Sequence, residues 1–456
     1  PYAQLHYPFE GEMARGTEAD RDALIHSTYE GYAIPPKFYP ADFINEGVDQ
    51  TRGWFFTLHA IATMVFDSVA FKNVISSGLV LDAKGNKMSK HVGNVVNPFD
   101  MIHKYGADAV RFYMMTNSEP WDNLKFDANG VDEVRRKLFG TLYNTYSFFA
   151  LYANVDNFDV DTPQVDFAKR PEIDRWILSC LQTLIKKVDS ELKSYDPTRA
   201  GRLIDNFVND DLSNTYVRQS RKRFWGKEMS EDKLSAYQTL HTCLLTVAKL
   251  LAPFAPFYSD QLYHDLGGEM TSVHLENFPQ ANEAFINTDL EERMEIARKI
   301  TSMTLALRRK VNIKVRQPLQ QIMIPAVSAE QKAQIEAVKD LIMSEVNVKE
   351  LKFVEGEDIL VKTVKCNFRT MGKKYGKLMK GVANVMSNLD QHQISQLEKE
   401  GSLTINVEGQ DLVVDAADVE IISQDIPGWL VSNDGNVTVA LEVELTDELI
   451  KEGTAR

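Results

Sequence analysis

Two lysines and a serine stand close together in the segment Lys87-Met88-Ser89-Lys90. Lysine carries a mobile point charge on a flexible stem, so a loop that holds two of them suits the transient neutralisation of a triphosphate. Lys87, Ser89 and Lys90 are therefore the candidate catalytic residues. The alternative is an ordinary solvated loop, because short lysine-rich motifs are hypotheses until their structural context is known.

A second polar cluster precedes this loop and contains Glu46, Gly47, Asp49 and Gln50, followed by Trp54. Carboxylate and amide oxygens accept hydrogen bonds from ribose hydroxyls and from an ammonium group, and glycine lets the backbone approach a ligand closely. Trp54 would then line a pocket for an apolar side chain. In the alternative interpretation Trp54, Phe55 and Phe56 belong to the core and Asp49 only caps the helix that follows.

The elements around both clusters indicate an α/β arrangement. Residues 73–81 form an apolar, β-branched run that predicts a strand, and residues 82–86 have turn composition, so the lysines lie just past a strand end. Ligands of open α/β sheets collect at such carboxyl ends. Residues 101–105 and 107–115 predict helices behind the loop.

The rest of the chain changes character twice. Helical periodicity dominates residues 131–266 and predicts a helix bundle. Residues 290–456 begin with a predicted helix at 290–310 and continue with short strands, separated by helices, at 321–324, 351–354, 403–407 and 437–441. The fold class is therefore α/β plus α. We place the domain boundaries at residues 1–125, 126–289 and 290–456.

Composition indicates a globular protein of the cytoplasm. Hydrophobic residues make up 44% and charged residues 25% of the chain, and no apolar run approaches the roughly 20 residues of a membrane span. Cys180, Cys243 and Cys366 are far apart and form no Cys-x-x-Cys pair, so we predict neither a zinc or other metal site nor a disulfide. Buried free thiols in a reducing compartment are the expectation.

The net charge of −14 conceals local basic clusters. Lysines and arginines gather in residues 298–316, in residues 361–389 and on the helical segment 218–223. Basic stripes on an acidic protein bind a phosphate backbone while the remaining surface repels other polyanions. The alternative for any single stripe is a solvated helix face.

Taken together, these segments resemble class I aminoacyl-tRNA synthetases of the isoleucine-specific branch. Residues 49–55 resemble the aminoacyl-adenylate segment of that family and residues 87–90 its second signature. The order of the supporting runs also matches the family, at residues 105–111, 209–218, 251–257 and 314–319. Gln50 and Trp54 argue against the valine- and leucine-specific branches.

The resemblance implies a fold of three parts. They are the C-terminal half of a Rossmann-type nucleotide-binding domain with its stem-contact region, a helix-bundle anticodon-binding domain, and a small C-terminal α/β domain. It further implies a ligase that activates isoleucine with ATP, as the Mg²⁺ complex, to isoleucyl-adenylate and transfers isoleucine to tRNA(Ile). We expect a monomer without a membrane partner.

The resemblance also assigns roles. Glu46, Gly47, Asp49 and Gln50 would hold the ribose, the amino group and the carboxyl end of the adenylate, and Trp54 would contact the isoleucine side chain. Lys90 would stabilise charge on the departing pyrophosphate with help from Lys87 and Ser89, while Met88 packs the loop against the fold.

Single-stranded anticodon bases are read by stacking on aromatic or arginine planes and by contacts to their edges. The resemblance therefore makes Tyr216, Arg218, Arg221, Lys222 and Arg223 the candidate tRNA contacts. Trp225 is either a further contact or a core residue.

The chain also departs from the family pattern. His91 occupies a position where many relatives have serine or arginine, and we interpret it as an ordinary polar residue. The 456 residues contain no His-x-Gly-His signature, which binds ATP in the family, and no editing insertion. We therefore expect that this polypeptide alone makes no isoleucyl-adenylate, and the alternative function is a catalytically silent tRNA-binding module.

Overall fold

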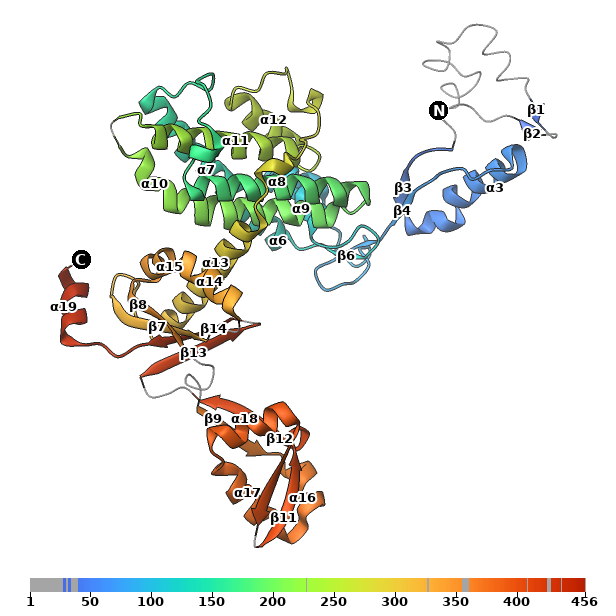
Figure 1. Cartoon of the computed structure of the whole chain (residues 1–456). Helices are drawn as coiled ribbons and strands as arrows, with labels where there is room; N and C mark the ends of the chain where they lie inside the picture. Colours follow the sequence, from blue (N-terminus) through green and yellow to red (C-terminus); the bar gives the residue numbers. More distant parts are fainter. Residues whose placement is uncertain are drawn as a thin grey trace. The chain divides into compact units, whose positions relative to one another are not determined.

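The computed structural model describes most of the chain in two compact units, residues 1–286 and residues 287–456. The described residues are 28–29, 32–33, 40–226, 228–325, 328–354, 361–407, 409–424, 428–435 and 437–455. The ribbon in Figure 1 follows the chain from blue at the N-terminus to red at the C-terminus.

Among the described residues of the first unit, a short antiparallel pair, β1 (Thr28–Tyr29) and β2 (Tyr32–Ala33), precedes a β-α-β segment. In that segment β3 (Ile44–Gly47) lies parallel to β4 (Val74–Ser77). The connection between them consists of the 3₁₀ turn η2 (Val48–Arg52) and the helix α3 (Trp54–Phe66). A parallel pair needs such a crossover, because the end of the first strand and the start of the second lie at opposite ends of the pair.

The predicted strand at residues 73–81 is two strands rather than one. It ends as β4 at Ser77 and resumes as β5 (Val80–Leu81), which pairs in parallel with β6 (Leu124–Lys125). The break falls at Gly78, where an added Cβ would lie 2.1 Å from the carbonyl oxygen of Asp122. Close approach of a neighbouring backbone therefore interrupts the strand and requires glycine.

The two predicted helices behind the lysine loop are confirmed as α4 (Pro98–Tyr105) and α5 (Ala107–Thr116). Gly106, with φ of +89°, separates them. The side chains of α5 pack with β6 and the next helix, α6 (Ala128–Val134), in a small core. Its buried members are Ala109, Val110, Tyr113, Leu124, Phe126 and Val131.

The helix bundle predicted from periodicity follows, drawn in teal to yellow-green in Figure 1. Its further helices are η3 (Arg135–Phe139), α7 (Gly140–Asp156), α8 (Glu172–Lys193), α9 (Pro197–Asn206), η5 (Phe207–Val217), α10 (Arg218–Phe224), α11 (Glu231–Leu251) and α12 (Pro256–Asp265). Side-chain caps fix several helix starts: Asp196 accepts a hydrogen bond from the Arg199 N–H, and Ser230 from the Lys233 N–H. Pro256 opens α12 and has no N–H that a preceding turn could bind.

Two of these segments, η3 and η5, are π-helices. The longer, η5, spans 11 residues and joins α9 to α10 without a break in the helical backbone. Its buried side chains include Phe207, Leu212 and Tyr216. A search for a 3.6-residue period cannot reveal such a segment, because π-helical hydrogen bonds run between residues five apart.

The second unit begins with α13 (Thr288–Lys310), close to the predicted helix at residues 290–310. A four-stranded sheet of order β13-β14-β7-β8 comes next, built from Trp429–Asp434, Val437–Glu442, Leu319–Pro325 and Val348–Val354. Helix α13 packs on β13 and β14, while α15 (Lys339–Val346) packs on β8; α14 (Ala329–Ala337) packs on α13 (Figure 1). The last described helix is α19 (Asp447–Ala455).

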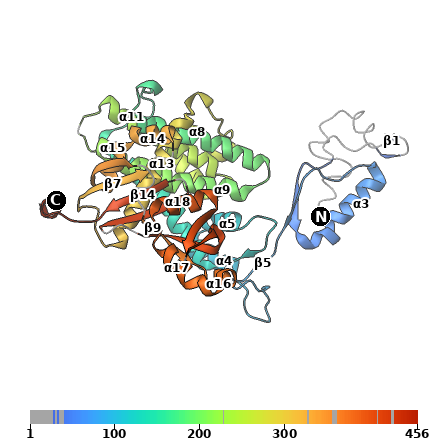
Figure 2. The ribbon, with the colours of Figure 1, turned by 60° about the horizontal axis from the view of Figure 1, so that its bottom comes forward.

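A second group of strands in this unit has its own buried core. It contains two antiparallel pairs, β9 (Val361–Cys366) with β12 (Val419–Gln424) and β10 (Ser402–Val407) with β11 (Gln410–Asp415). Its helices, which lie against these strands in Figure 2, are α16 (Phe368–Tyr375), α17 (Met379–Ser387) and α18 (Gln391–Glu400). Among the described helices of the whole chain, none has the length and apolar character needed to span a bilayer.

Candidate functional site

The five residues predicted to bind an adenylate lie together at the carboxyl end of β3. Glu46 Oε2 accepts a hydrogen bond of 2.9 Å from the Gly47 N–H. Gln50 Nε2 donates to Asp49 Oδ2 over 3.1 Å, and Gln50 Oε1 accepts from the Trp54 N–H over 2.8 Å. Gln50, rather than Asp49, therefore supplies the side-chain oxygen that caps the start of α3.

This cluster is open to solvent. Trp54 is 43% exposed, whereas its neighbour Phe55 is buried, so the core interpretation holds for Phe55 and not for the tryptophan. An added Cβ at Gly47 would lie 2.7 Å from Asp49 Oδ1, so a side chain at position 47 would displace the Asp49 carboxylate. The absence of a side chain at Gly47 thus leaves room for the Asp49 carboxylate above the strand end.

The predicted lysine loop follows β5, at the carboxyl end of the neighbouring parallel pair. Both lysine side chains, Lys87 and Lys90, are exposed, whereas Met88 and Ser89 are half-buried. Met88 packs against the α5 and β6 core, as predicted. Ser89 Oγ accepts a hydrogen bond of 3.3 Å from the Val92 N–H, so part of its hydrogen-bonding capacity closes the turn.

Two residues outside the predicted site organise the loop. The Asp82 carboxylate accepts hydrogen bonds from the Lys84 and Asn86 N–H groups, and Asn94 donates to it from Nδ2. These hydrogen bonds lower the pKa of Asp82 to about 2, and the bond from Asn94 has the largest effect. Asn94 follows Gly93, whose φ of +71° lets the chain reverse after the lysines.

The five predicted tRNA contacts divide between two sides of the η5–α10 segment. Tyr216 is completely buried and donates from its hydroxyl to Asp174 Oδ1 over 2.8 Å. Arg223 donates from Nη1 and Nη2 to the two oxygens of the same carboxylate, over 2.6 and 2.8 Å. Burial raises the pKa of the Tyr216 hydroxyl well above its usual value.

These contacts correct the expectation for Tyr216 and Arg223. A base cannot stack on a ring that has no exposed surface, and Arg223 uses its guanidinium to neutralise Asp174 and Asp232. The sequence could not separate them from their neighbours because their partner, Asp174, lies more than 40 positions away.

Arg218, Arg221 and Lys222 lie on the exposed side of α10 with Trp225, which is 57% exposed. Arg221 and Lys222 each lie three or four residues from both Arg218 and Trp225, which places the four positions along one side of a helix. Trp225 is therefore a surface residue and not part of the core. We refer to these four residues as the α10 strip.

Other basic residues counted in the sequence have their main partners within the chain. Arg308 is 1% exposed and donates to the carbonyl oxygens of Gln317 and Asn347, each over 2.9 Å. Burial lowers its pKa to about 10. Lys374 is held by the carboxylates of Asp415 and Asp418. The two basic stripes of the second unit thus overstate the charge that is offered to a partner.

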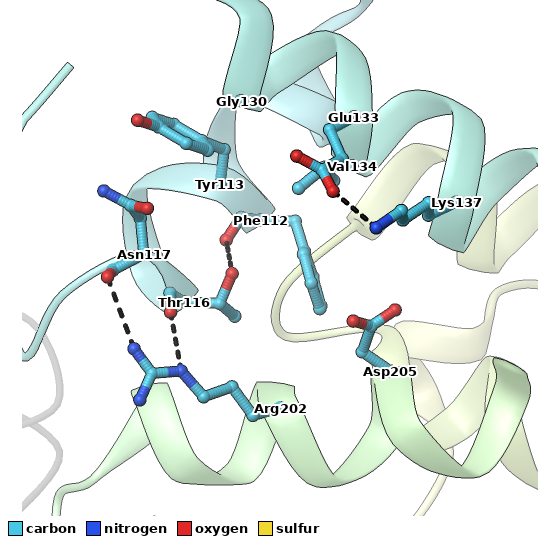
Figure 3. Close-up of a pocket in the computed structure, with 10 residues that line it drawn as sticks. All are labelled: Phe112, Tyr113, Thr116, Asn117, Gly130, Glu133, Val134, Lys137, Arg202 and Asp205. Carbon is cyan, nitrogen blue, oxygen red and sulfur yellow. Dashed lines mark hydrogen bonds and ion pairs between the residues drawn. The ribbon is translucent and has the colours of Figure 1, made fainter. Parts of the chain in front are cut away.

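A pocket of about 280 Å³ opens between α5, the α6–η3 segment and α9 (Figure 3). Its charged groups are largely engaged within the protein. Arg202 donates to the carbonyl oxygens of Thr116 and Asn117, and Lys137 is paired with Glu133. Asp205 accepts from Asn209 Nδ2 over 2.7 Å, and burial raises the pKa of its carboxyl. The pocket therefore lies where these helices are held together by interactions within the protein.

The three cysteines form no disulfide with one another; Cys243 is fully buried, whereas Cys180 and Cys366 are half-buried. Burial raises the pKa of the Cys243 thiol. Among the described residues, no group of three or more histidine, cysteine or acidic side chains is arranged to hold a metal ion.

Comparison with known proteins identifies two families of domain. Residues 25–127 match the class I tRNA synthetases (I, L, M and V), and residues 174–324 match the anticodon-binding domain of tRNA ligases. A ternary complex of LeuRS, tRNA and LeuAMS from Agrobacterium radiobacter K84 matches 63% of this chain and 32% of that chain. Its sequence identity is 21% and its TM-score is 0.46, a likeness too weak to assign the fold.

Curated relatives match along the whole chain. It is 61% identical to an isoleucine--tRNA ligase of Bacteroides thetaiotaomicron and 62% identical to one of Bacteroides fragilis, in both cases over 100% of this chain. It spans 38% and 39% of the length of these two relatives. The chain belongs to the class I aminoacyl-tRNA synthetases, in the branch of the isoleucine--tRNA ligases.

Proposed function

We propose that the chain forms part of an isoleucyl-tRNA synthetase, contributing residues that act on the aminoacyl-adenylate and residues that contact tRNA(Ile). The observation that carries the proposal is the pair of polar clusters at the carboxyl ends of β3 and β5, in a chain 62% identical to a relative named isoleucine--tRNA ligase. Both clusters follow parallel strands, where α/β proteins bind ligands.

In the first reaction the isoleucine carboxylate attacks the α-phosphorus of ATP, bound as its Mg²⁺ complex, and the bond to the leaving pyrophosphate breaks. Glu46, Gly47, Asp49 and Gln50 hold the ribose and the polar end of isoleucine, and Trp54 contacts its side chain. Lys90, with Lys87 and Ser89, neutralises the charge that develops on pyrophosphate.

In the second reaction a terminal ribose hydroxyl of tRNA(Ile) attacks the adenylate carbonyl carbon, and AMP leaves. Arg218, Arg221 and Lys222 bind RNA phosphates from the exposed side of α10. We assign residues 1–125, 126–289 and 290–456 to the catalytic, anticodon-binding and small α/β domains. The synthetase acts as a monomer in the cytoplasm.

The test is isoleucine-dependent exchange of pyrophosphate into ATP by the complete ligase that contains these residues. Lys90→Ala should lower the exchange rate by roughly a hundredfold or more, because a charge that stabilises the leaving group is lost. Lys84→Ala, in which an exposed lysine of the same loop is removed, is the matched control and should retain near-normal exchange.

Equal exchange rates for Lys90→Ala and the unaltered ligase would contradict the role of the loop. Exchange that valine or leucine supports as well as isoleucine would contradict the amino-acid assignment.

A further inference from the structure

One asparagine side chain binds the backbone of the lysine loop at two points. Asn94 Oδ1 accepts a hydrogen bond of 2.8 Å from the Ser89 N–H, and Asn94 Nδ2 donates to the Lys87 carbonyl oxygen over 3.2 Å. These backbone groups flank Met88. The amide of Asn94 thus fixes the direction of the chain at the centre of the Lys87-Met88-Ser89-Lys90 segment.

The orientation of this amide is set by Asp82. Asn94 Nδ2 also donates to Asp82 Oδ2 over 3.0 Å, so the nitrogen and the oxygen of the amide are not interchangeable. Asp82 is itself fixed, because its Oδ1 accepts from the N–H groups of Lys84, over 3.0 Å, and Asn86, over 2.8 Å. The carboxylate is therefore tied to the strand end, and the asparagine is tied to the carboxylate.

The loop has a further anchor in Met88, which packs against the core of α5 and β6. With the backbone bound by Asn94 and the methionine packed, the flexible side chains of Lys87 and Lys90 remain exposed. A cation on such a stem reaches a phosphate only from the place where its backbone is held. A displacement of about 1 Å at a catalytic group can cost about a hundredfold in rate.

We propose that Asn94, oriented by Asp82, is a positioning residue for adenylate formation. It holds the backbone of Lys87 and Ser89 so that the lysines meet the triphosphate as the bond to pyrophosphate breaks. This inference rests on the proposed function. Asn94 touches no reacting atom, so its loss acts on the rate of the chemical step through the lysines.

The experiment measures kcat and KM for isoleucine and ATP in pyrophosphate exchange by the complete ligase. Asn94→Ala removes both contacts to the loop backbone and should lower kcat by roughly tenfold to a hundredfold, with KM for isoleucine changed less than threefold or so. Asn94→Asp should be at least as damaging, because it sets a second carboxylate against Asp82.

A rescue variant separates positioning from general damage. In the double variant D82N/N94D the donor and the acceptor exchange places: the new amide at position 82 donates to the new carboxylate at position 94. Position 94 still accepts from the Ser89 N–H. We expect kcat to recover at least about fivefold relative to Asn94→Asp alone, since a charge-assisted hydrogen bond is restored.

The outcomes also separate this inference from the proposed function. Normal kcat in Asn94→Ala, combined with a large loss in Lys90→Ala, would overturn the positioning role alone. Normal exchange in both variants would overturn the role of the whole loop. A rise in KM for isoleucine equal to the fall in kcat/KM, or no recovery in D82N/N94D, would also count against positioning. Unchanged thermal unfolding and tRNA affinity would confirm that each variant is folded.

Discussion

At the scale of single residues, Asp174 shows how a buried charge organises the bundle. Its carboxylate is completely buried and accepts hydrogen bonds from Tyr216, Arg223 and Ser235, which come from three successive helical segments. A buried carboxylate is tolerated only when partners of this kind satisfy it. Tyr216 and Arg223, which were predicted to contact tRNA, thus help to hold η5, α10 and α11 together on α8.

Asp174→Ala should lower the free energy of unfolding of the chain by about 3–5 kcal/mol, because it leaves Arg223 half-buried without its main partner. Urea unfolding followed by tryptophan fluorescence measures this, since the buried Trp176 lies two positions away. The control is Asp189→Ala on the same helix, which breaks an exposed pair with Lys193 and should cost less than about 1 kcal/mol. Similar losses of unfolding free energy in the two variants would contradict the role of Asp174 in organising the bundle.

At the scale of elements, the packing of α9 near α5 leaves the Asp205 carboxyl group poorly solvated. Asp205 lines the pocket of Figure 3 with Glu133, Lys137 and Arg202, and Asp210 also lies near enough to act on its charge. Burial first, and then Asp210 and Glu133, raise the pKa of Asp205 above its usual 3.8. A raised pKa means that the folded chain binds this proton more tightly than the unfolded chain does.

The sign of the pH dependence follows. The contribution of Asp205 to the free energy of unfolding is greatest at low pH and declines as pH rises from about 3.9 through the raised folded value. Asp205→Asn keeps an oxygen for Asn209 and removes the charge. The variant should therefore be at least as stable as the unaltered chain at pH 7, and lose that advantage near pH 3.5. Urea unfolding at both pH values checks this, and a variant that is less stable at pH 7 would contradict it.

Prediction from sequence succeeded for elements whose signal is local. The helices behind the loop, the bundle, the start of α13 and the strands at residues 403–407 and 437–441 all carry their own periodicity, and the structure confirms them. The break at Gly78 and the π-helix η5 were not predictable, because one depends on Asp122 from a distant segment and the other has no 3.6-residue period. The same reason applies to Asp82 and Asn94, whose importance lies in contacts rather than in residue type.

At the scale of the whole molecule, the charge offered to a polyanion is smaller than the sequence suggests. Of the basic residues counted along the chain, Arg223, Arg308 and Lys374 are committed to internal partners. The α10 strip places three cationic side chains and one indole on the exposed side of the helix. On a protein of net charge −14, RNA should therefore bind locally, and its affinity should depend on salt through few contacts.

Binding of tRNA(Ile) measured over a range of salt concentrations tests this. Arg221→Ala and Lys222→Ala should each make the slope of log K against log salt shallower by about 0.7 to 0.9, as expected for one lost phosphate contact. Trp225→Ala should weaken binding by about 1–3 kcal/mol and leave the slope unchanged, because stacking releases no counterions. Lys187→Ala on α8 is the control; a loss in this variant as large as that in Arg221→Ala would contradict a localised surface.

Because η5 spans 11 residues and continues directly into α10, the length of this segment is constrained. Each residue added to or removed from a continuous helix turns everything beyond it by roughly a quarter of a turn. One deletion between Phe207 and Val217 would swing Arg223 away from Asp174 and bring another side of α10 to the surface. Neighbouring side chains can repack around a substitution in this segment, but they cannot compensate for a change in its length. Insertions and deletions should therefore be absent from this segment in functional variants, even where individual residues change freely.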